Sequence, residues 1–268
     1  MAHPRPTSLA LLIGAGPTSG AGIARQLATP VSQGGGGMAV ALLARNAERL
    51  STLASNLKAS VPGAVVGAFP TDTSPVNLKK AFEAIKKHKD FDGCRLRLGV
   101  FHIKHSSREP FLETTPESYD AAFSEYNTGA FVFAQESLKR MYEEAGGMKP
   151  LDETGGEKLG TIIFTGTLGA LRTSAMYSAY GGTRSAARSL AQAVAKEHSQ
   201  YGVHVVHAIA NGSIIDTDNE EHESAKEATE KGRKMSAKAV ADTYLWLARQ
   251  ESTLWTHELD LRPAQEKF

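Results

Sequence analysis

The chain lacks several features that mark secreted, membrane-spanning or nucleic-acid-binding proteins. Its 268 residues include one cysteine, Cys94, which cannot form an internal disulfide and suits a reducing compartment. No apolar run reaches the roughly 20 residues that a membrane-spanning helix needs. The 30 basic and 29 acidic side chains give a net charge of +1, so no excess charge favours nucleic acid or an anionic membrane. We therefore expect a cytoplasmic protein with neither of these as a partner.

The chain instead alternates short apolar segments with amphipathic ones. Strands are expected at residues 9–13, 39–43, 65–69, 98–103, 161–165, 203–209 and 254–261. Helices are expected from residue 23, over 47–57, from Pro75, and over 115–141, 178–198 and 236–249. Apolar strands between amphipathic helices are typical of a parallel sheet covered on both faces. We predict a single α/β domain over residues 1–268, with a doubly wound parallel sheet (a Rossmann fold) in three layers.

Three polar segments interrupt this alternation. Residues 33–37 (QGGGG) and 146–160 are expected to be surface loops, the first of them flexible. Residues 216–233 are heavily charged. The segment 212–235 around them is read as a solvated helical excursion or as a lid and substrate segment over the cleft, and the two interpretations are compatible.

A glycine-rich turn, GAGPTSGAG, follows the first expected strand. Gly14, Gly16, Gly20 and Gly22 lie there between strand and helix, where glycine permits a tight turn and lets backbone amides approach a diphosphate. A β-branched side chain at Gly20 is therefore expected to block the diphosphate while leaving the protein folded. The glycines alone also fit a purely structural turn.

The residues after the second and third expected strands bear on which dinucleotide binds. Arg45 and Asn46 stand where an adenosine ribose would lie. An arginine there suits a 2′-phosphate, whereas an acidic residue would hold a free 2′-hydroxyl. We therefore expect NADP(H) rather than NAD(H), with a solvated strand end as the alternative role of Arg45. Asp72 fits both a contact to the adenine amino group and the cap of the next helix.

Taken together, these motifs resemble the short-chain dehydrogenase/reductase family over nearly the whole chain. The similarity also rests on Asp72-Thr73, on GTIIFTGTLGALR at 160–172, on YSAYGGTRSAARSLAQAVAKE at 177–197, on YGVHVVHAIANGSI at 201–214 and on WTHELDLRP at 255–263. The resemblance implies a Rossmann sheet, a nicotinamide cofactor, and hydride transfer to or from a carbonyl or similar group.

The resemblance also implies a catalytic set. Tyr180 takes the place of the family's proton donor, Thr167 that of its serine and Arg184 that of its lysine. Asn127 takes the place of the family's asparagine, although it stands one residue closer to Gly129 than the family pattern. Tyr177 is a nearby alternative to Tyr180, but no cation stands four residues after it.

The cofactor contacts implied by the resemblance extend across the chain. They are Gly14, Gly16, Thr18, Ser19, Gly20, Gly22, Arg45, Asn46, Asp72, Thr73, His102, Tyr180, Arg184, Ile214 and Thr217. Two family motifs are replaced: residues 101–104 read FHIK instead of Asn-Asn-Ala-Gly, and residues 211–212 read Asn-Gly instead of Pro-Gly.

The arginine leaves three functions open. In the family, the lysine places a positive charge beside the tyrosine and hydrogen-bonds the nicotinamide ribose, whereas Arg184 keeps the charge on a planar fork that stays protonated. The leading interpretation is an NADP(H)-dependent oxidoreductase acting on a small organic carbonyl or alcohol. A second is an imine or iminium reductase, or a non-redox Diels–Alderase-like cyclase, in specialised metabolism, because reducing an iminium ion needs no proton donor. The third is a catalytically silent nucleotide-binding protein.

The family commonly assembles through the helices at 118–141 and 178–198, so a homodimer or homotetramer is expected.

Overall fold

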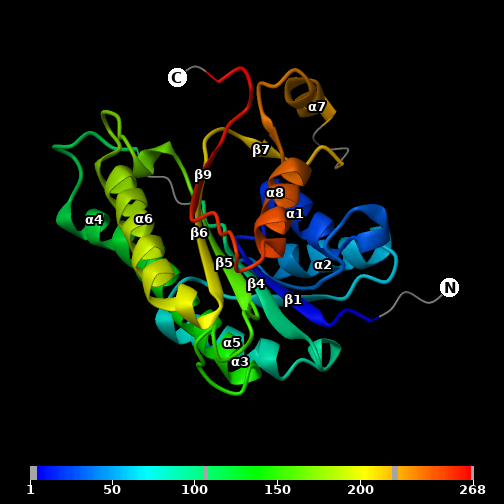
Figure 1. The fold of residues 1–268 in the computed structure, drawn as a ribbon. Coiled ribbons are helices and arrows are strands. Elements are labelled where there is room, and N and C mark those ends of the chain that lie inside the picture. The colour runs from blue at the N-terminus through cyan, green and yellow to red at the C-terminus, as the bar shows by residue number, and fades with distance from the viewer. Residues whose placement is uncertain (1–4, 105–107, 219–222, 267–268) are drawn as a thin grey trace.

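A seven-stranded parallel sheet forms the centre of the molecule (Figure 1). The computed structural model describes residues 5–104, 108–218 and 223–266. The strands run in the spatial order β3-β2-β1-β4-β5-β6-β9. They are β1 (Ser8–Ile13), β2 (Ala39–Ala44), β3 (Val66–Pro70), β4 (Arg95–Phe101), β5 (Gly160–Gly166), β6 (Val203–Ala210) and β9 (Glu258–Leu261). The order of the strands reverses between β1 and β4, and the cleft at such a switch point is where open α/β sheets bind ligands.

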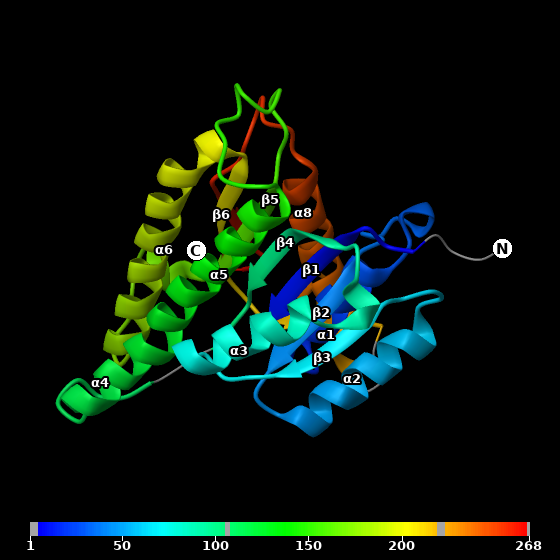
Figure 2. The same ribbon diagram turned by 90° about the horizontal axis from the view of Figure 1, so that it is seen from below.

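Helices cover both faces of the sheet, as Figure 2 shows from below. One face carries α1 (Ser19–Ala28), α2 (Ala47–Ser60) and α8 (Ala237–Arg249). The other carries α3 (Pro75–Lys86), α5 (Gly129–Glu144) and α6 (Ser178–His198), and α4 (Pro116–Phe123) lies beside α6. Each face has its own apolar core, because the inward strand residues alternate between the two layers of helices. The predicted three-layer Rossmann fold is confirmed.

Shorter elements complete the chain. On either side of the charged residues 216–233, β7 (Ile214–Ile215) pairs with β8 (Met235–Ser236), and α7 (Glu223–Glu230) lies between them in sequence. Single turns of 3₁₀-helix are found at η1 (Val31–Gln33), η2 (Lys89–Phe91), η4 (Leu168–Ala170) and η5 (Ser199–Tyr201), and η3 (Ser124–Thr128) is a π-helix. The expected helical excursion in residues 212–235 is therefore present as α7.

Three expected element boundaries were wrong. Helix α1 begins at Ser19 rather than residue 23. Its first turn packs closely against Ala15 and Ala237, which is possible because Gly20 and Gly22 have no Cβ. The helix expected over 115–141 is broken by η3, where one extra residue per turn interrupts the α-helical hydrogen bonds. The last strand is confined to β9, where it has β6 as a pairing partner.

The QGGGG loop was expected to be flexible, but its backbone is hydrogen-bonded to the end of α1. The amide of Gly36 donates to the Gln26 carbonyl at 3.0 Å and that of Gly37 to the Thr29 carbonyl at 2.8 Å. A Cβ at Gly35 would lie 2.2 Å from the Thr29 carbonyl oxygen. Glycine here permits close packing against the helix end.

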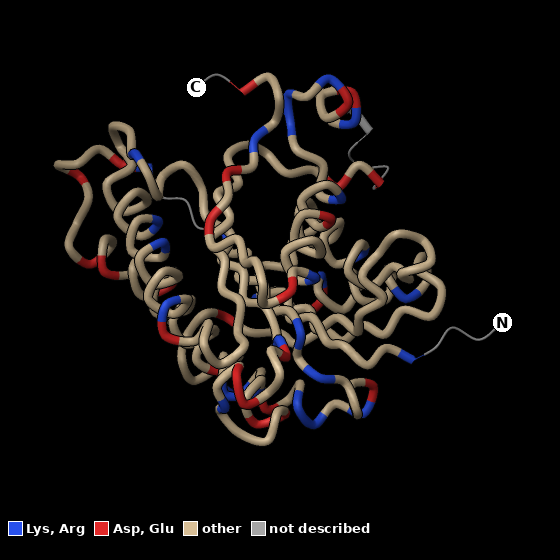
Figure 3. Tube along the Cα trace, in the orientation of Figure 1, with Lys and Arg blue, Asp and Glu red and all other residues tan. Residues whose placement is uncertain are grey.

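Charges of both signs are spread along the chain, and the central strands are largely uncharged (Figure 3). In the part of the chain that the structure describes, no helix is both long and apolar enough to cross a membrane.

Candidate active site

Two cavities lie at the carboxyl end of the sheet, on either side of the switch point. One, of about 420 Å³, extends from the glycine turn past the end of β5 to Tyr180. The other, of about 400 Å³, extends from the glycine turn to the ends of β2 and β3. Ile103 and Lys104, which follow β4, line both cavities. The pair therefore forms a divided groove across the sheet edge, and we call its parts the Tyr180 cavity and the Arg45 cavity.

The glycines of the turn serve different purposes. Gly14 has a φ of +91°, and a Cβ there would lie 2.0 Å from the His102 carbonyl oxygen, so glycine is required for the turn to pass β4. A Cβ at Gly16 would meet only the Gly14 carbonyl, at 3.9 Å, and Gly16 lines the Arg45 cavity. Of the four glycines, Gly16 has the space for a ligand to approach.

Gly20 and Gly22 face protein rather than either cavity. A Cβ at Gly20 would lie 2.7 Å from the Ala15 Cα, within the turn itself, and one at Gly22 would lie 2.6 Å from the Ala237 Cβ on α8. The expectation that a β-branched residue at Gly20 leaves the protein folded was therefore wrong, because backbone atoms of the turn occupy that space.

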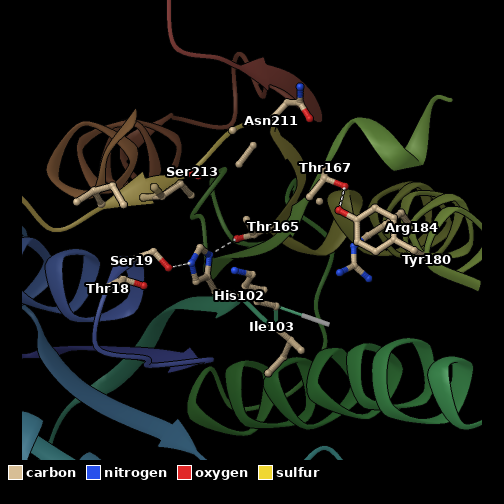
Figure 4. A pocket seen from close by; sticks show the side chains of 16 residues that line it. Thr18, Ser19, His102, Ile103, Thr165, Thr167, Tyr180, Arg184, Asn211 and Ser213 are labelled. Carbon is tan, nitrogen blue, oxygen red and sulfur yellow. Dashed lines mark hydrogen bonds between the residues drawn. The ribbon is translucent and has the colours of Figure 1, made fainter. Parts of the chain in front are cut away.

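Tyr180 and Thr167 form a hydrogen-bonded pair at the wall of the Tyr180 cavity. The hydroxyl of Tyr180, near the start of α6, lies 2.7 Å from Thr167 Oγ1 at the end of β5. Both residues line the cavity, and Figure 4 shows their hydroxyls facing one another. The ring of Tyr177, whose centre lies 5.6 Å from that of Tyr180, lines a separate depression with Thr167 and Tyr180.

Arg184 lies one helical turn after Tyr180, and its side chain is only 2% exposed. Its guanidinium carbon lies 3.6 Å from the centre of the Tyr126 ring and 4.5 Å from that of Tyr180. Arginine stacks on aromatic faces in a way that lysine cannot reproduce. The guanidinium is thus packed against two rings, and Arg184 also lines the Tyr180 cavity.

Asn127 lies outside both cavities. It belongs to η3, and its side-chain amide donates to the carbonyl of Thr183 on α6 at 2.9 Å. Tyr126, the preceding residue, points inward to Arg184 and donates its hydroxyl to the Thr165 carbonyl at 3.1 Å. Counting back from Gly129 by the family spacing leads to Tyr126, so that count could have identified it from the sequence.

His102 joins the glycine turn to the central strands. Its Nε2 lies 2.8 Å from Ser19 Oγ, and its Nδ1 lies 3.0 Å from Thr165 Oγ1 (Figure 4). Burial lowers the pKa of His102 to about 4, so the ring is neutral near pH 7. His102 lines the Tyr180 cavity with Thr18 and Ser19, but both of its ring nitrogens are bonded to protein, so its polar link to the cavity passes through Ser19.

Three of the expected polar contacts, Arg45, Asp72 and Thr73, line the Arg45 cavity. Arg45 is exposed at the end of β2, and Thr73 packs close to Gly129 at the start of α5. The carboxylate of Asp72 accepts from the amide and hydroxyl of Ser74, at 2.9 and 2.6 Å, and from the Asn77 side chain. These bonds, chiefly the one from the Ser74 hydroxyl, lower the pKa of Asp72. Asp72 therefore forms the turn that leads into α3, whose N-cap is Ser74, and the residue still borders the cavity.

The remaining expected contacts divide between the cavity and the protein. Ile214 lines the Tyr180 cavity, whereas Thr217 lines neither cavity. Asn46 caps α2 by accepting from the Arg49 amide at 2.8 Å. Asp216, which is 2% exposed, binds Arg25 of α1 at 2.6 Å and so fixes the start of the charged segment against that helix.

Sequence comparisons relate this chain to a protein family and to one characterised dehydrogenase. A family model described as enoyl-(acyl carrier protein) reductase matches residues 16–258. L-2,3-butanediol dehydrogenase of Corynebacterium glutamicum is 30% identical over 200 residues, which cover 74% of this chain and 70% of that protein.

Structural comparisons give the same picture over nearly the whole chain. A short-chain dehydrogenase from Rhodopseudomonas palustris has a TM-score of 0.72 at 25% identity, covering 97% of this chain and 100% of its own. L-sorbose reductase of Gluconobacter frateurii, complexed with NADPH and L-sorbose, has a TM-score of 0.76 at 18% identity and 98% coverage of both chains. An NADPH-bound short-chain oxidoreductase from Pseudomonas aeruginosa, described as containing an atypical catalytic centre, has a TM-score of 0.75 at 19% identity, covering 99% of this chain and 100% of its own.

Proposed function

The chain belongs to the short-chain dehydrogenase/reductase family, and from this premise we propose that it is an NADP(H)-dependent oxidoreductase that transfers a hydride between nicotinamide and a small organic carbonyl or alcohol. The observation that carries the proposal is the 2.7 Å contact between the hydroxyls of Tyr180 and Thr167 at the wall of the Tyr180 cavity. A substrate oxygen in that cavity can reach both hydroxyls.

The residues of the groove fit a dinucleotide. Gly16 leaves open space beside the N-terminus of α1, where backbone amides and the helix dipole favour a diphosphate. Arg45 borders the other cavity, where a guanidinium pairs well with a 2′-phosphate. The same fold carries NADPH in the L-sorbose reductase and in the Pseudomonas oxidoreductase. When bound, the nicotinamide supplies or accepts the hydride.

The chain's own residues manage the proton. In the reducing direction Tyr180 donates its hydroxyl proton to the substrate oxygen as negative charge develops there, and Thr167 donates a second hydrogen bond to the same oxygen. The positive charge of Arg184, beside the Tyr180 ring, stabilises the negative charge left on the tyrosine oxygen. Arg184 stays protonated throughout, so it contributes charge and position rather than a proton.

A second candidate function follows from the burial of Arg184. An iminium substrate arrives with a positive charge that hydride neutralises, so such a reaction proceeds without a proton donor. A site that keeps the groove but has a fixed guanidinium in place of a lysine suits that chemistry. The same site would also suit a non-redox cyclase. The relative from Corynebacterium glutamicum, named for a small diol, favours the carbonyl and alcohol reaction instead.

Initial-rate measurements test the proposal. The full chain is assayed with NADPH and NADH against matched panels of ketones and cyclic imines, and with NADP⁺ against small alcohols. Turnover of ketones or alcohols with preference for the phosphorylated cofactor is expected. Turnover of imines alone moves the assignment to the second candidate. Tight NADPH binding with no turnover of any substrate identifies a silent nucleotide-binding protein.

We further propose that the chain assembles as a homodimer or homotetramer through the outer faces of α4, α5 and α6. Phe131 on α5 is 46% exposed and Tyr119 on α4 is 38% exposed, so these faces present aromatic surface that a second copy would bury. Light scattering coupled to gel filtration is expected to give a multiple of the chain's 28.6 kDa. A Phe131→Glu variant is expected to shift the mass towards that of one chain.

A further inference from the structure

Four polar side chains, three of them buried, form a row between α8 and the glycine turn. The hydroxyl of Tyr244 lies 2.8 Å from Thr165 Oγ1, which lies 3.0 Å from His102 Nδ1. On the other side of the ring, His102 Nε2 lies 2.8 Å from Ser19 Oγ. Tyr244 is 0% exposed, and Thr165 and His102 are each 8% exposed. Figure 4 shows the last three members of the row at the edge of the cavity.

Burial decides which way the hydrogens in this row point. Thr165 is the one hydrogen-bond partner of the Tyr244 hydroxyl among the described residues. Burial raises the pKa of Tyr244, so the proton stays on its oxygen and has to be donated to Thr165 Oγ1. Thr165 then donates its own proton to His102 Nδ1. The opposite direction would leave the buried Tyr244 hydroxyl without an acceptor, which is the costlier arrangement.

The direction of the row sets the state of His102 and Ser19. The pKa of His102 is about 4, so near pH 7 the ring carries a single N–H. With Nδ1 accepting from Thr165, that N–H is at Nε2 and donates to Ser19 Oγ. The hydroxyl oxygen of Ser19, the first residue of α1, thus accepts the hydrogen bond from His102. Its own hydroxyl proton is then turned towards the Tyr180 cavity, which Ser19 lines.

We propose that Tyr244 and Thr165 are positioning residues, which act through His102 to hold the Ser19 hydroxyl as a hydrogen-bond donor towards the diphosphate of the bound dinucleotide. The inference rests on the proposed function for the diphosphate, whereas the direction of the row is a property of the protein without cofactor. Tyr244 lines neither cavity, so its effect on binding passes through the row.

The first test reads the tautomer of His102 without cofactor. Nitrogen-15 NMR of the imidazoles distinguishes the two neutral tautomers, and a His102→Asn sample assigns the His102 signals among the nine histidines. The Nε2–H tautomer is expected in the unsubstituted protein. Tyr244→Phe removes the group that sets the direction, so the Nδ1–H form is expected to gain population. A dominant Nδ1–H form in the unsubstituted protein overturns the proposal.

The second test is a double-mutant cycle on NADPH affinity, measured by fluorescence titration. Ser19→Ala is expected to weaken binding about tenfold, the scale of losing a donor to a charged group, and Tyr244→Phe about threefold. The double variant is expected to bind as Ser19→Ala does, because Tyr244 acts through that hydroxyl. Additive losses overturn the proposal, since they show that Tyr244 affects binding by another route.

A matched control and a second variant keep the test sharp. Tyr142→Phe removes a tyrosine hydroxyl that bonds a histidine at 2.8 Å, but at the far end of α5, so NADPH affinity is expected to be unchanged. Thr165→Val breaks the row with little change in volume, and its NADPH affinity is expected to fall about threefold, as for Tyr244→Phe. It replaces Tyr244→Phe in the test if Tyr244→Phe folds poorly. If the unsubstituted protein binds no NADPH, the proposed function fails, while the tautomer measurement still decides the direction of the row.

Discussion

The guanidinium of Arg184 stacks on the ring of Tyr126, with its carbon 3.6 Å from the ring centre, and both side chains are almost fully buried. The two residues come from α6 and from the π-helical turn η3. A planar cation on an aromatic face is stabilising where water is excluded, and an ammonium group on a flexible stem does not reproduce the contact. The ring of Tyr126 therefore stabilises the buried guanidinium of Arg184 in a way that depends on arginine at position 184.

This relationship predicts that Arg184→Lys lowers stability more than turnover. Loss of the stack is expected to cost about 1–2 kcal/mol in the free energy of unfolding. Turnover is expected to fall only a few fold, because the positive charge beside Tyr180 is kept. Urea unfolding and ketone reduction measure the two effects. Arg184→Lys in a Tyr126→Leu background is the control, in which the stability cost should largely disappear.

Removing the hydroxyl of Tyr180 tests its role as the proton donor. Tyr180→Phe is expected to lower ketone turnover about a hundredfold or more, with NADPH affinity little changed. Tyr177→Phe, the matched substitution on the neighbouring ring, is expected to leave turnover within a few fold. With a pre-formed iminium substrate, Tyr180→Phe is expected to cost little. Near-normal ketone reduction by Tyr180→Phe would exclude Tyr180 as the acid.

Arg45 is expected to determine the preference between cofactors. Arg45→Asp removes the partner of a 2′-phosphate and adds repulsion, so the ratio of NADPH to NADH affinity is expected to fall at least tenfold. Arg95→Asp makes the same change at an exposed position at the amino end of β4 and serves as the control. A wild-type protein that already prefers NADH would contradict the assignment of Arg45.

Two glycines of the turn are expected to respond differently to alanine. Gly14→Ala puts a Cβ about 2.0 Å from the His102 carbonyl at a φ of +91°, so a loss of about 3 kcal/mol or more in unfolding free energy is expected. Gly16→Ala has room for its methyl group and should fold normally, but it narrows the space for the diphosphate. Thermal unfolding and NADPH titration of both variants separate folding from binding.

The buried neutral His102 predicts acid sensitivity. Its pKa is lowered from 6.5 to about 4 in the folded protein, so below pH 6.5 the unfolded chain binds a proton that the folded chain does not. The stabilisation is therefore complete above pH 6.5 and is lost as the pH falls towards 4, by about 3 kcal/mol at most. His102→Gln is expected to reduce the difference in unfolding free energy between pH 7.5 and pH 5. An unchanged difference would show that His102 does not carry it.

The sequence by itself determined the fold and the places of the main catalytic candidates. Apolar periodicity and a proline at the first helical position are local signals, and they predicted the bounds of α6 and the start of α3 at Pro75. The thirteen-residue separation of Thr167 and Tyr180 spans the end of one strand and the start of one helix. Parallel topology then brings both to the same edge of the sheet.

Only the tertiary structure decided what surrounds those candidates. The row from Ser19 to Tyr244 joins residues 83, 63 and 79 positions apart, on α1, β5, α8 and the residue after β4. Family spacing points to position 126, but the stack of the Tyr126 ring on Arg184 joins η3 to α6 and is visible only in the structure. Spacing within one element predicts which face a side chain occupies, but the side chain that meets it from another element depends on how the elements pack. That packing results from the whole core, so no local pattern records it.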